Sequence, residues 1–350
     1  MRPCPSEWSG TVKRSAVGLI EIAETNNFAA AFHAAARGKR GRGDVEAFRA
    51  NLDRELEKLR GDLLAETFSP GPMRRFRIHD PKPGMIHAPC FRDRVAHHAI
   101  MAHVGPVLDC TLVFDTYACR PGKGTLAAVK RASEHARHYE WFAQIDIRAY
   151  FASIDHAELL GLLGHKFKNP GLLRLLATII EAHEDQPGRG LPIGTLTSQH
   201  FANFYIAGLD RFLLESCRVR GFVRYMDDVV WWAGDRATAS AALPLATAWL
   251  TERLHLEVKR PVRLGRSAEG LNFCGFRILP NRLLLSRRRR TRYGLLRRRA
   301  ERHWLGGVLD ATGLQAAFAS ALALTVHADA VPWRRQQLVR QPVDPALANL

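Results

Sequence analysis

The chain has 350 residues, of which 47% are hydrophobic, and it carries a formal net charge of +17. This length allows a buried core and more than one subdomain, and the excess of Lys and Arg predicts a polyanionic partner. No uninterrupted apolar stretch approaches about 18 residues, and the first residues lack the apolar segment of a signal peptide, so we expect neither a membrane partner nor export.

The six cysteines and fifteen histidines show no metal-binding spacing. The cysteines are scattered without a C-x-x-C pair, and the histidines form no H-E-x-x-H motif, so zinc is not indicated. Dispersed cysteines of this kind are typical of reduced proteins, and we expect a cytoplasmic location.

Helices around one short pair of strands are predicted for the first 140 residues. Phe48, Leu52, Leu56, Leu59 and Leu63 recur at helical spacing, and a Pro-Gly-Pro segment follows that helix. A basic loop at 117–125 contains Gly-Lys-Gly, but the G-x-x-x-x-G-K-[ST] pattern is absent, which disfavours an NTPase. The expected elements are helices at 11–36 and 44–66, strands at 75–78 and 85–87 around a turn at 80–84, and a helix from 93 to 104.

Two predicted strands contain the candidate metal-binding acids. Trp141–Ile147 is an apolar strand with Asp146 near its end, and Tyr225-Met226-Asp227-Asp228 lies between two apolar runs, which predicts a β-hairpin with both aspartates at its turn. Asp-Asp also suits the turn of a plain surface hairpin. Carboxylates on separate strands are what two-metal phosphoryl transfer needs, and together the three aspartates favour a magnesium site.

Asp155 is a fourth acid that could be taken for a metal ligand, and we interpret it as structural. The segment Asp155-His156-Ala157-Glu158 precedes a leucine-rich run, and an acid followed three residues later by Glu is typical of a capping box at the start of a helix.

The positive charge is concentrated near the C-terminus. Arginines interleaved with Tyr293 and Trp304 suit phosphate contacts and base stacking, so we favour nucleic acid over a membrane surface, a localisation signal or a solvated face. The predicted nucleic-acid-binding residues are Arg287, Arg288, Arg289, Arg290, Arg292, Arg297, Arg298 and Arg299.

Three ordered motifs give the chain a specific resemblance. Asp146 is followed by Phe151 five residues later, Pro192 to Gln199 forms a Pro-x-Gly-x-x-x-Ser-x loop and helix, and Tyr225 to Asp228 follows. This order resembles the palm of a reverse transcriptase, and the similarity covers residues 50 to 280. The resemblance implies an α+β right-hand polymerase with fingers, a ferredoxin-like palm of antiparallel sheet plus helices, and a helical thumb. The implied divisions are an N-terminal helical extension with the start of the fingers at 1–74, fingers at 75–140, a palm at 141–280 that is split with fingers around 157–190, and a basic helical thumb at 281–350.

The Ile-Gly-x-x-x-Ser-Gln form at Ile193 to Gln199 resembles reverse transcriptases of the diversity-generating retroelement type, within the group II intron-like superfamily of RNA-directed DNA polymerases. Relatives of other types more often carry Gln-Gly-x-x-x-Ser-Pro. That subtype implies copying of a template-repeat RNA into adenine-mutagenised cDNA, from a primer and dNTPs, with a small basic oligomeric accessory variability protein. The alternatives are a defence-associated, retron-like or intron-type reverse transcriptase, or a non-catalytic basic RNA-binding protein.

The resemblance also implies roles for individual residues. Asp146, Asp227 and Asp228, with the Ile147 carbonyl, would hold two Mg²⁺ ions, or Mn²⁺ in their place. Isoleucine at 193 cannot make the hydrogen bonds of the glutamine in many relatives, which predicts low fidelity because selection then depends on shape. Gly275 with Phe273 and Phe276 forms a hairpin that holds the primer end or simply packs. The implied dNTP-binding residues are Lys82, Arg120, Phe151, Ile193, Gly194, Gln199 and Lys259. Phe151 is either a gate against ribonucleotides or a core aromatic, and Lys259 either protonates the leaving pyrophosphate or is a solvated lysine.

Overall fold

The computed structural model describes residues 14–78 and 84–341. Its internal contacts divide the chain into two units, each built from several stretches of sequence. The first unit comprises the described residues up to Val113, Ile147–Asp210 and Ala248–Glu257, and the second comprises Phe114–Asp146, Arg211–Thr247 and Val258 onward. Helices combine with antiparallel sheets in both units, as the sequence predicts.

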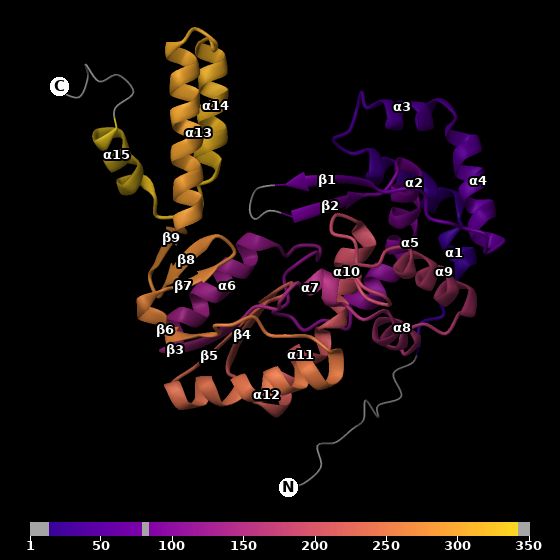
Figure 1. Cartoon of the computed structure of the whole chain (residues 1–350), viewed down its shortest axis with the longest axis horizontal. Coiled ribbons are helices and arrows are strands. Elements are labelled where there is room, and N and C mark those ends of the chain that lie inside the picture. The colour runs from indigo at the N-terminus through magenta and orange to yellow at the C-terminus, as the bar shows by residue number, and fades with distance from the viewer. Residues whose placement is uncertain (1–13, 79–83, 342–350) are drawn as a thin grey trace. The chain divides into compact units, whose positions relative to one another are not determined.

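The first unit is largely helical and carries one two-stranded sheet (Figure 1). Strand β1 (Arg74–Ile78) pairs antiparallel with β2 (Gly84–Ala88). The helices are α1 (Leu19–Ile22), α2 (Thr25–Ala36), α3 (Gly43–Ala50), α4 (Leu52–Leu64), α5 (Phe91–Asp109), α7 (Tyr150–Ser153), α8 (His156–Gly164), α9 (Pro170–Glu181) and α10 (Leu196–Tyr205). Helices α11 (Ala207–Arg211) and α12 (Arg236–Leu254) contribute residues to both units.

Apolar side chains of α5 form the centre of the first unit. Val95, Ile100 and Val104 are fully buried there. The rings of Phe32 and Phe48 pack against Phe91 at centroid distances of 6.0 and 5.2 Å, which ties α2 and α3 to the start of α5. Both long N-terminal helices of the sequence prediction are broken in two, at residues 23–24 and at Asn51.

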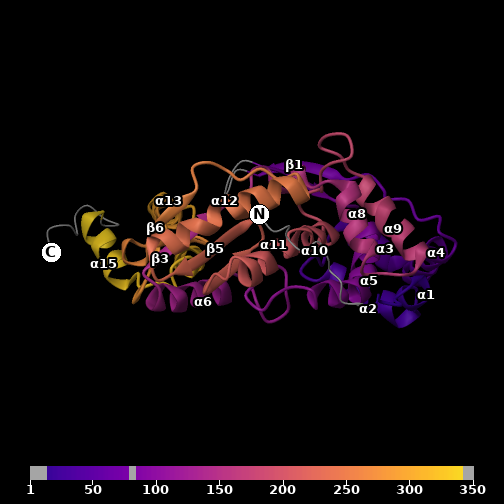
Figure 2. The same ribbon diagram turned by 90° about the horizontal axis from the view of Figure 1, so that it is seen from below.

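A four-stranded antiparallel sheet with the order β4-β5-β3-β6 organises the second unit. Its strands are β3 (Trp141–Ile145), β4 (Gly221–Tyr225), β5 (Asp228–Ala233) and β6 (Arg263–Arg266). Adjacent residues of a strand face opposite sides of a sheet. On one side the ring of Trp232 lies 5.2 Å from that of His135 in α6 (Thr125–His138), and on the other the Trp231 indole donates a hydrogen bond of 3.0 Å to Ala239 of α12. Figure 2 accordingly shows α6 and α12 on opposite sides of β3 and β5.

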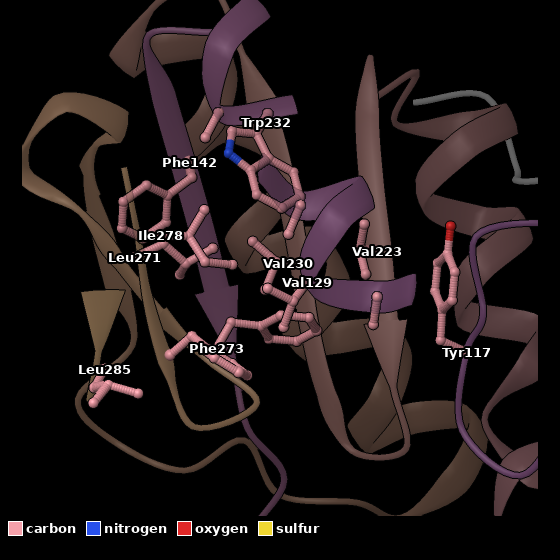
Figure 3. Packing of buried hydrophobic residues seen from close by; sticks show 14 of the residues in the cluster. Tyr117, Val129, Phe142, Val223, Val230, Trp232, Leu271, Phe273, Ile278 and Leu285 are labelled. Atoms are coloured by element: carbon pink, nitrogen blue, oxygen red, sulfur yellow. The ribbon is translucent and has the colours of Figure 1, made fainter. Parts of the chain in front are cut away.

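A second sheet, β7-β8-β9, shares a core with the first. Figure 3 shows Phe142, Val230 and Trp232 of the four-stranded sheet packed among Leu271 and Ile278 of the three-stranded one. The strands of this sheet are β7 (Leu271–Phe273), β8 (Phe276–Leu279) and β9 (Arg282–Leu285).

Helices and short turns complete the second unit. The π-helical turn η1 (Phe212–Ser216) precedes β4, and the 3₁₀ turn η2 (Ser267–Glu269) precedes β7. The basic C-terminal region is helical, as predicted, and consists of α13 (Arg287–Leu305), α14 (Ala311–Ala323) and α15 (Val331–Arg340). Among the described residues, no helix is both long and apolar enough to cross a membrane.

Candidate active site

The sheet register brings Asp146 and Asp228 to facing positions. Ile145 pairs with Val229 in the antiparallel β3–β5 ladder, so extending that ladder by one residue sets Asp146 opposite Asp228. Tyr225 pairs with Asp228 in the β4–β5 hairpin, which leaves Met226 and Asp227 as a two-residue turn. The sequence predicted the hairpin but set both aspartates at its turn, whereas Asp228 is the first residue of β5.

The turn that carries Asp227 is conformationally strained. Met226 has φ of +59°, a region that costs a residue with a side chain about 1–2 kcal/mol. Arg224, which is fully buried, donates a guanidinium hydrogen bond of 3.0 Å to the Met226 carbonyl. The backbone of Arg224 is itself held by Asp115 and Tyr117 at 3.0 Å each. This buried arginine therefore stabilises a turn geometry that the local sequence disfavours.

The environment of Asp228 disfavours its charge. Burial first, together with the neighbouring carboxylates of Asp227 and Asp146, raises the pKa of Asp228 to about 7, although a hydrogen bond from Gln144 and the charge of Arg263 act in the opposite direction. Gln144 Nε2 lies 2.7 Å from Asp228 Oδ1. The site thus concentrates negative charge that is only partly balanced by the protein.

Lys259 is held beside Asp146 by two contacts. Its Nζ lies 3.3 Å from Asp146 Oδ2, and its backbone N–H donates a hydrogen bond of 2.8 Å to the Asp146 carbonyl. The sequence suggested Lys259 as a dNTP-binding residue, and the structure places its ammonium group, about half exposed, at the predicted metal ligand Asp146.

The three aspartates have the ligand chemistry of a magnesium site, but their side chains are not arranged as one. Among the described residues, no group of three His, Cys, Asp or Glu side chains is arranged to hold a metal ion. Asp146 instead contacts Lys259, and Asp228 contacts Gln144. Carboxylate oxygens are the donors that Mg²⁺ prefers, and a cation would offset the burial and the mutual repulsion that together raise the pKa of Asp228. Binding would therefore require the Lys259 side chain to move away from Asp146 and would not require a new fold.

The β7–β8 turn, for which the sequence predicts either a contact with the primer end or simple packing, lies close to these carboxylates. Burial first, and then the charge of Asp228, raises the pKa of the Cys274 thiol in that turn. Gly275 has φ of +82°, and a Cβ there would lie 2.6 Å from Nε of Arg289. The Arg289 guanidinium in turn lies 4.0 Å from the ring centre of Phe276. This turn accordingly links the carboxylates to the first turn of α13.

Predicted nucleotide-binding residues of the first unit also lie together. Leu191 donates a backbone hydrogen bond of 2.8 Å to Phe151, and His87 of β2 donates one of 2.8 Å to Ile193. Gly194 has φ of +116°, and a Cβ there would lie 2.8 Å from Ile86 Cγ2. Backbone hydrogen bonds therefore join Phe151 and the Ile193 loop to β2 as one connected set. The Ile193 side chain is 42% exposed.

The remaining predicted positions fall in different places. Gln199 lies in α10, and Ile147 is buried in the first unit. Arg120 belongs to the second unit, where it donates a hydrogen bond of 3.0 Å to the Thr116 carbonyl. Lys82 lies outside the described residues.

Seven of the eight predicted arginines in α13 present their side chains at least partly to solvent. Arg297 departs from the prediction, because it is 2% exposed, lies 3.0 Å from Glu301 and donates a hydrogen bond to the Gln341 carbonyl. The charged group of Arg297 is therefore paired inside the C-terminal helical region and does not face solvent. Arg288, Arg289 and Arg292 instead line a pocket of about 340 Å³ together with Thr125 and His327.

Sequence reasoning missed two residues of the site, Gln144 and Arg224. Each is a buried polar residue in an otherwise apolar strand, and that pattern was the available signal. Asp155, by contrast, has the predicted capping role, since its side chain accepts a hydrogen bond of 3.2 Å from the Glu158 N–H at the start of α8.

Comparison with known proteins identifies the fold family. The family described as reverse transcriptase (RNA-dependent DNA polymerase) matches residues 80–260, more than half of the chain. This chain belongs to the reverse transcriptase family. The match spans β2, β3, the β4–β5 hairpin and Lys259, and so includes all three aspartates.

Several curated proteins are similar to part of this reverse transcriptase family member. The group II intron-encoded protein LtrA of Lactococcus lactis subsp. cremoris is 25% identical over 172 residues, which cover 47% of this chain and 29% of LtrA. The putative COX1/OXI3 intron 2 protein of Saccharomyces cerevisiae is 22% identical over 45% of this chain and 20% of its own length. Protein YkfC of Escherichia coli is 24% identical over 47% of each chain. The matched region thus spans less than half of each of these relatives.

Proposed function

We propose that this chain is an RNA-directed DNA polymerase that extends a primer along an RNA template by two-metal nucleotidyl transfer. The observation that carries the proposal is the facing position of Asp146 and Asp228 across β3 and β5, with Asp227 in the adjoining turn. A reverse transcriptase implies template RNA, a primer and dNTPs as its substrates. We further propose that the first unit contributes fingers, that the four-stranded sheet is the palm and that α13 to α15 form the thumb.

In the proposed reaction, Asp146, Asp227 and Asp228 would hold the divalent ions, with the Ile147 carbonyl as a further ligand. When bound, two such ions activate the primer 3′-hydroxyl and stabilise the charge of the triphosphate. Lys259 would move from Asp146 when a cation takes its place, and its ammonium group would then be available to donate a proton to the leaving pyrophosphate.

Nucleotide selection would come from the connected set around Ile193. Phe151 would exclude a ribose 2′-hydroxyl by its bulk, and Gly194 would keep the Ile193 loop close to β2. Arg120, Gln199 and Lys82 remain proposed dNTP contacts. The exposed arginines of α13 would bind nucleic-acid phosphates, and this predicts strongly salt-dependent binding.

The finer proposal is an error-prone enzyme of the diversity-generating retroelement type with a small basic accessory protein, acting in the cytoplasm. Ile193-Gly194 followed by Ser198-Gln199 supports it. The intron-type alternative is supported equally by the similarity to LtrA. Replacing Ile193 with Gln separates the two proposals. The retroelement proposal expects the variant to make fewer misincorporations opposite template adenine. An unchanged error spectrum would show that Ile193 is not the cause of low fidelity.

Primer extension on an RNA template with dNTPs and Mg²⁺ tests the activity itself. Asp227→Asn and Asp228→Asn should each abolish extension while leaving the melting temperature close to that of the wild type. Asp53→Asn is the matched control, since Asp53 is an exposed aspartate of α4. Full extension by Asp227→Asn would instead favour the non-catalytic RNA-binding alternative.

A further inference from the structure

Gln144 is a buried polar residue at the centre of the palm sheet. It lies on β3 between Ala143 and Ile145, which are 0% and 1% exposed, and is itself 7% exposed. A buried amide is costly unless it is hydrogen-bonded, because it gives up its contacts with water. An apolar residue would fill the same place without that cost, so the contacts of the amide group need an explanation.

Both hydrogen bonds of Gln144 come from its amide nitrogen. Nε2 donates to Asp228 Oδ1 at 2.7 Å and to the backbone carbonyl of Asn272 in β7 at 3.2 Å. Both partners are acceptors, so the orientation of the amide group is fixed by chemistry, and a flipped amide would turn its oxygen toward two other oxygens. The Oε1 atom is buried and has no hydrogen-bond partner within the described residues, so the contacts on the nitrogen side are made at the expense of the oxygen side.

The amide is not required to hold β3 in place. This strand forms backbone ladders with β5 on one side and β6 on the other. The sheet is therefore specified by main-chain pairing and by the apolar core, whereas the Gln144 side chain reaches two groups outside the backbone ladders of β3: a carboxylate oxygen of Asp228 and the Asn272 carbonyl of β7.

We propose that Gln144 is a positioning residue that fixes the Asp228 carboxylate against the β7–β8 hairpin and thereby prepares it to bind a divalent cation. The inference rests on the proposed function. One oxygen of Asp228 is held by the amide, so the carboxylate loses rotational freedom before the cation arrives. Groups that orient a metal ligand in this way typically change metal affinity by about 10- to 100-fold when removed.

Two substitutions test the proposal by different routes. Gln144→Met keeps the length and much of the volume of the side chain but removes both hydrogen bonds. Gln144→Glu keeps the shape but presents oxygens to Asp228 and to the Asn272 carbonyl, so it replaces attraction with repulsion. Asn272→Ala is the matched control, because the contact uses the main-chain carbonyl of Asn272 and its side chain is exposed.

The primary measurement is Mn²⁺ binding to the whole chain, followed by electron paramagnetic resonance without nucleic acid or dNTPs. We expect Gln144→Met to weaken Mn²⁺ binding about 10-fold or more and Asn272→Ala to leave the affinity unchanged. Gln144→Glu should change the Mn²⁺ affinity by a factor different from that of Gln144→Met, because its carboxylate repels Asp228 and does not merely release it. In primer extension, Gln144→Met should raise the Mg²⁺ concentration for half-maximal rate by the same factor, with the KM for dNTP kept within about two-fold.

The outcomes separate this inference from the polymerase proposal. Unchanged Mn²⁺ affinity in both Gln144 variants would overturn the positioning role, as would absence of Mn²⁺ binding in the wild type. If Mn²⁺ binds and the variants weaken it, yet no primer is extended under any condition, the positioning role is retained and the polymerase proposal is wrong. If Gln144→Met does not fold, the Mn²⁺ affinity of Gln144→Glu decides whether the positioning role holds, and its melting temperature without metal shows that this variant is folded.

Discussion

Replacing Gly194 with alanine should disturb the fold and the proposed nucleotide pocket together. The backbone at Gly194 has φ of +116°, a conformation that side chains rarely adopt, and the added Cβ would lie 2.8 Å from Ile86 Cγ2 and 3.1 Å from the His87 carbonyl. The conformational cost is about 1–2 kcal/mol, and overpacking against β2 adds about 1–3 kcal/mol. We therefore expect a loss of about 2–5 kcal/mol in the free energy of unfolding.

Gly188→Ala is a control for a positive φ without close packing. Gly188 has φ of +68°, but a Cβ there would meet nothing within 4 Å, so only about 1–2 kcal/mol should be lost. Urea denaturation followed by circular dichroism compares the two variants, and primer extension at varied dNTP gives the KM of each. Gly194→Ala should also raise the KM, because the Ile193 loop must move away from β2. Equal stabilities of the two variants would refute the argument from close packing.

Three further measurements probe other parts of the molecule. Burial, with a smaller contribution from His98, lowers the pKa of His97 to about 4. The unfolded chain then binds a proton below its ordinary pKa of 6.5 and the folded chain does not, so stability should fall by about 3 kcal/mol as the pH drops from 6.5 to 4. His97→Gln should flatten that dependence in urea titrations, and an unchanged slope would contradict it. Asp155→Ala should lower the free energy of unfolding by about 1 kcal/mol by removing the α8 cap, and loss of extension without a lower melting temperature would instead mark Asp155 as a ligand. Arg292→Gln should reduce the salt dependence of RNA binding by about one charge, whereas Arg297→Gln should mainly lower stability, which filter binding and thermal melting distinguish.

Local patterns in the sequence predicted those parts of the site that depend on neighbouring residues. The β4–β5 hairpin follows from two apolar runs around a polar break, and the α8 cap follows from Asp155 and Glu158 at capping-box spacing. The observed turn, Met226-Asp227, begins one residue before the predicted Asp227-Asp228 turn. Met226 adopts a positive φ that propensity alone would assign to Gly or Asn.

Features that depend on distant contacts were not predictable in the same way. The break at Asn51 divides an otherwise regular helical pattern, and Arg297 resembles its basic neighbours in sequence but is buried and bonded to the distant Gln341 carbonyl. Gln144 and Arg224 are polar residues in apolar strands. Gln144 bonds to Asp228, which is 84 positions away, and the backbone of Arg224 is held by the distant residues Asp115 and Tyr117. Only the folded sheet shows which acceptors those side chains reach.

The tryptophan pair of β5 gives this chain built-in optical probes. Trp231 and Trp232 are both fully buried, and they follow Asp228 on the same short strand. The Trp231 indole is hydrogen-bonded toward α12, whereas the Trp232 indole lies beside His135 of α6. The two fluorophores therefore sample different sides of the strand that begins at Asp228, and single Trp→Phe replacements would resolve changes on each side without an attached dye.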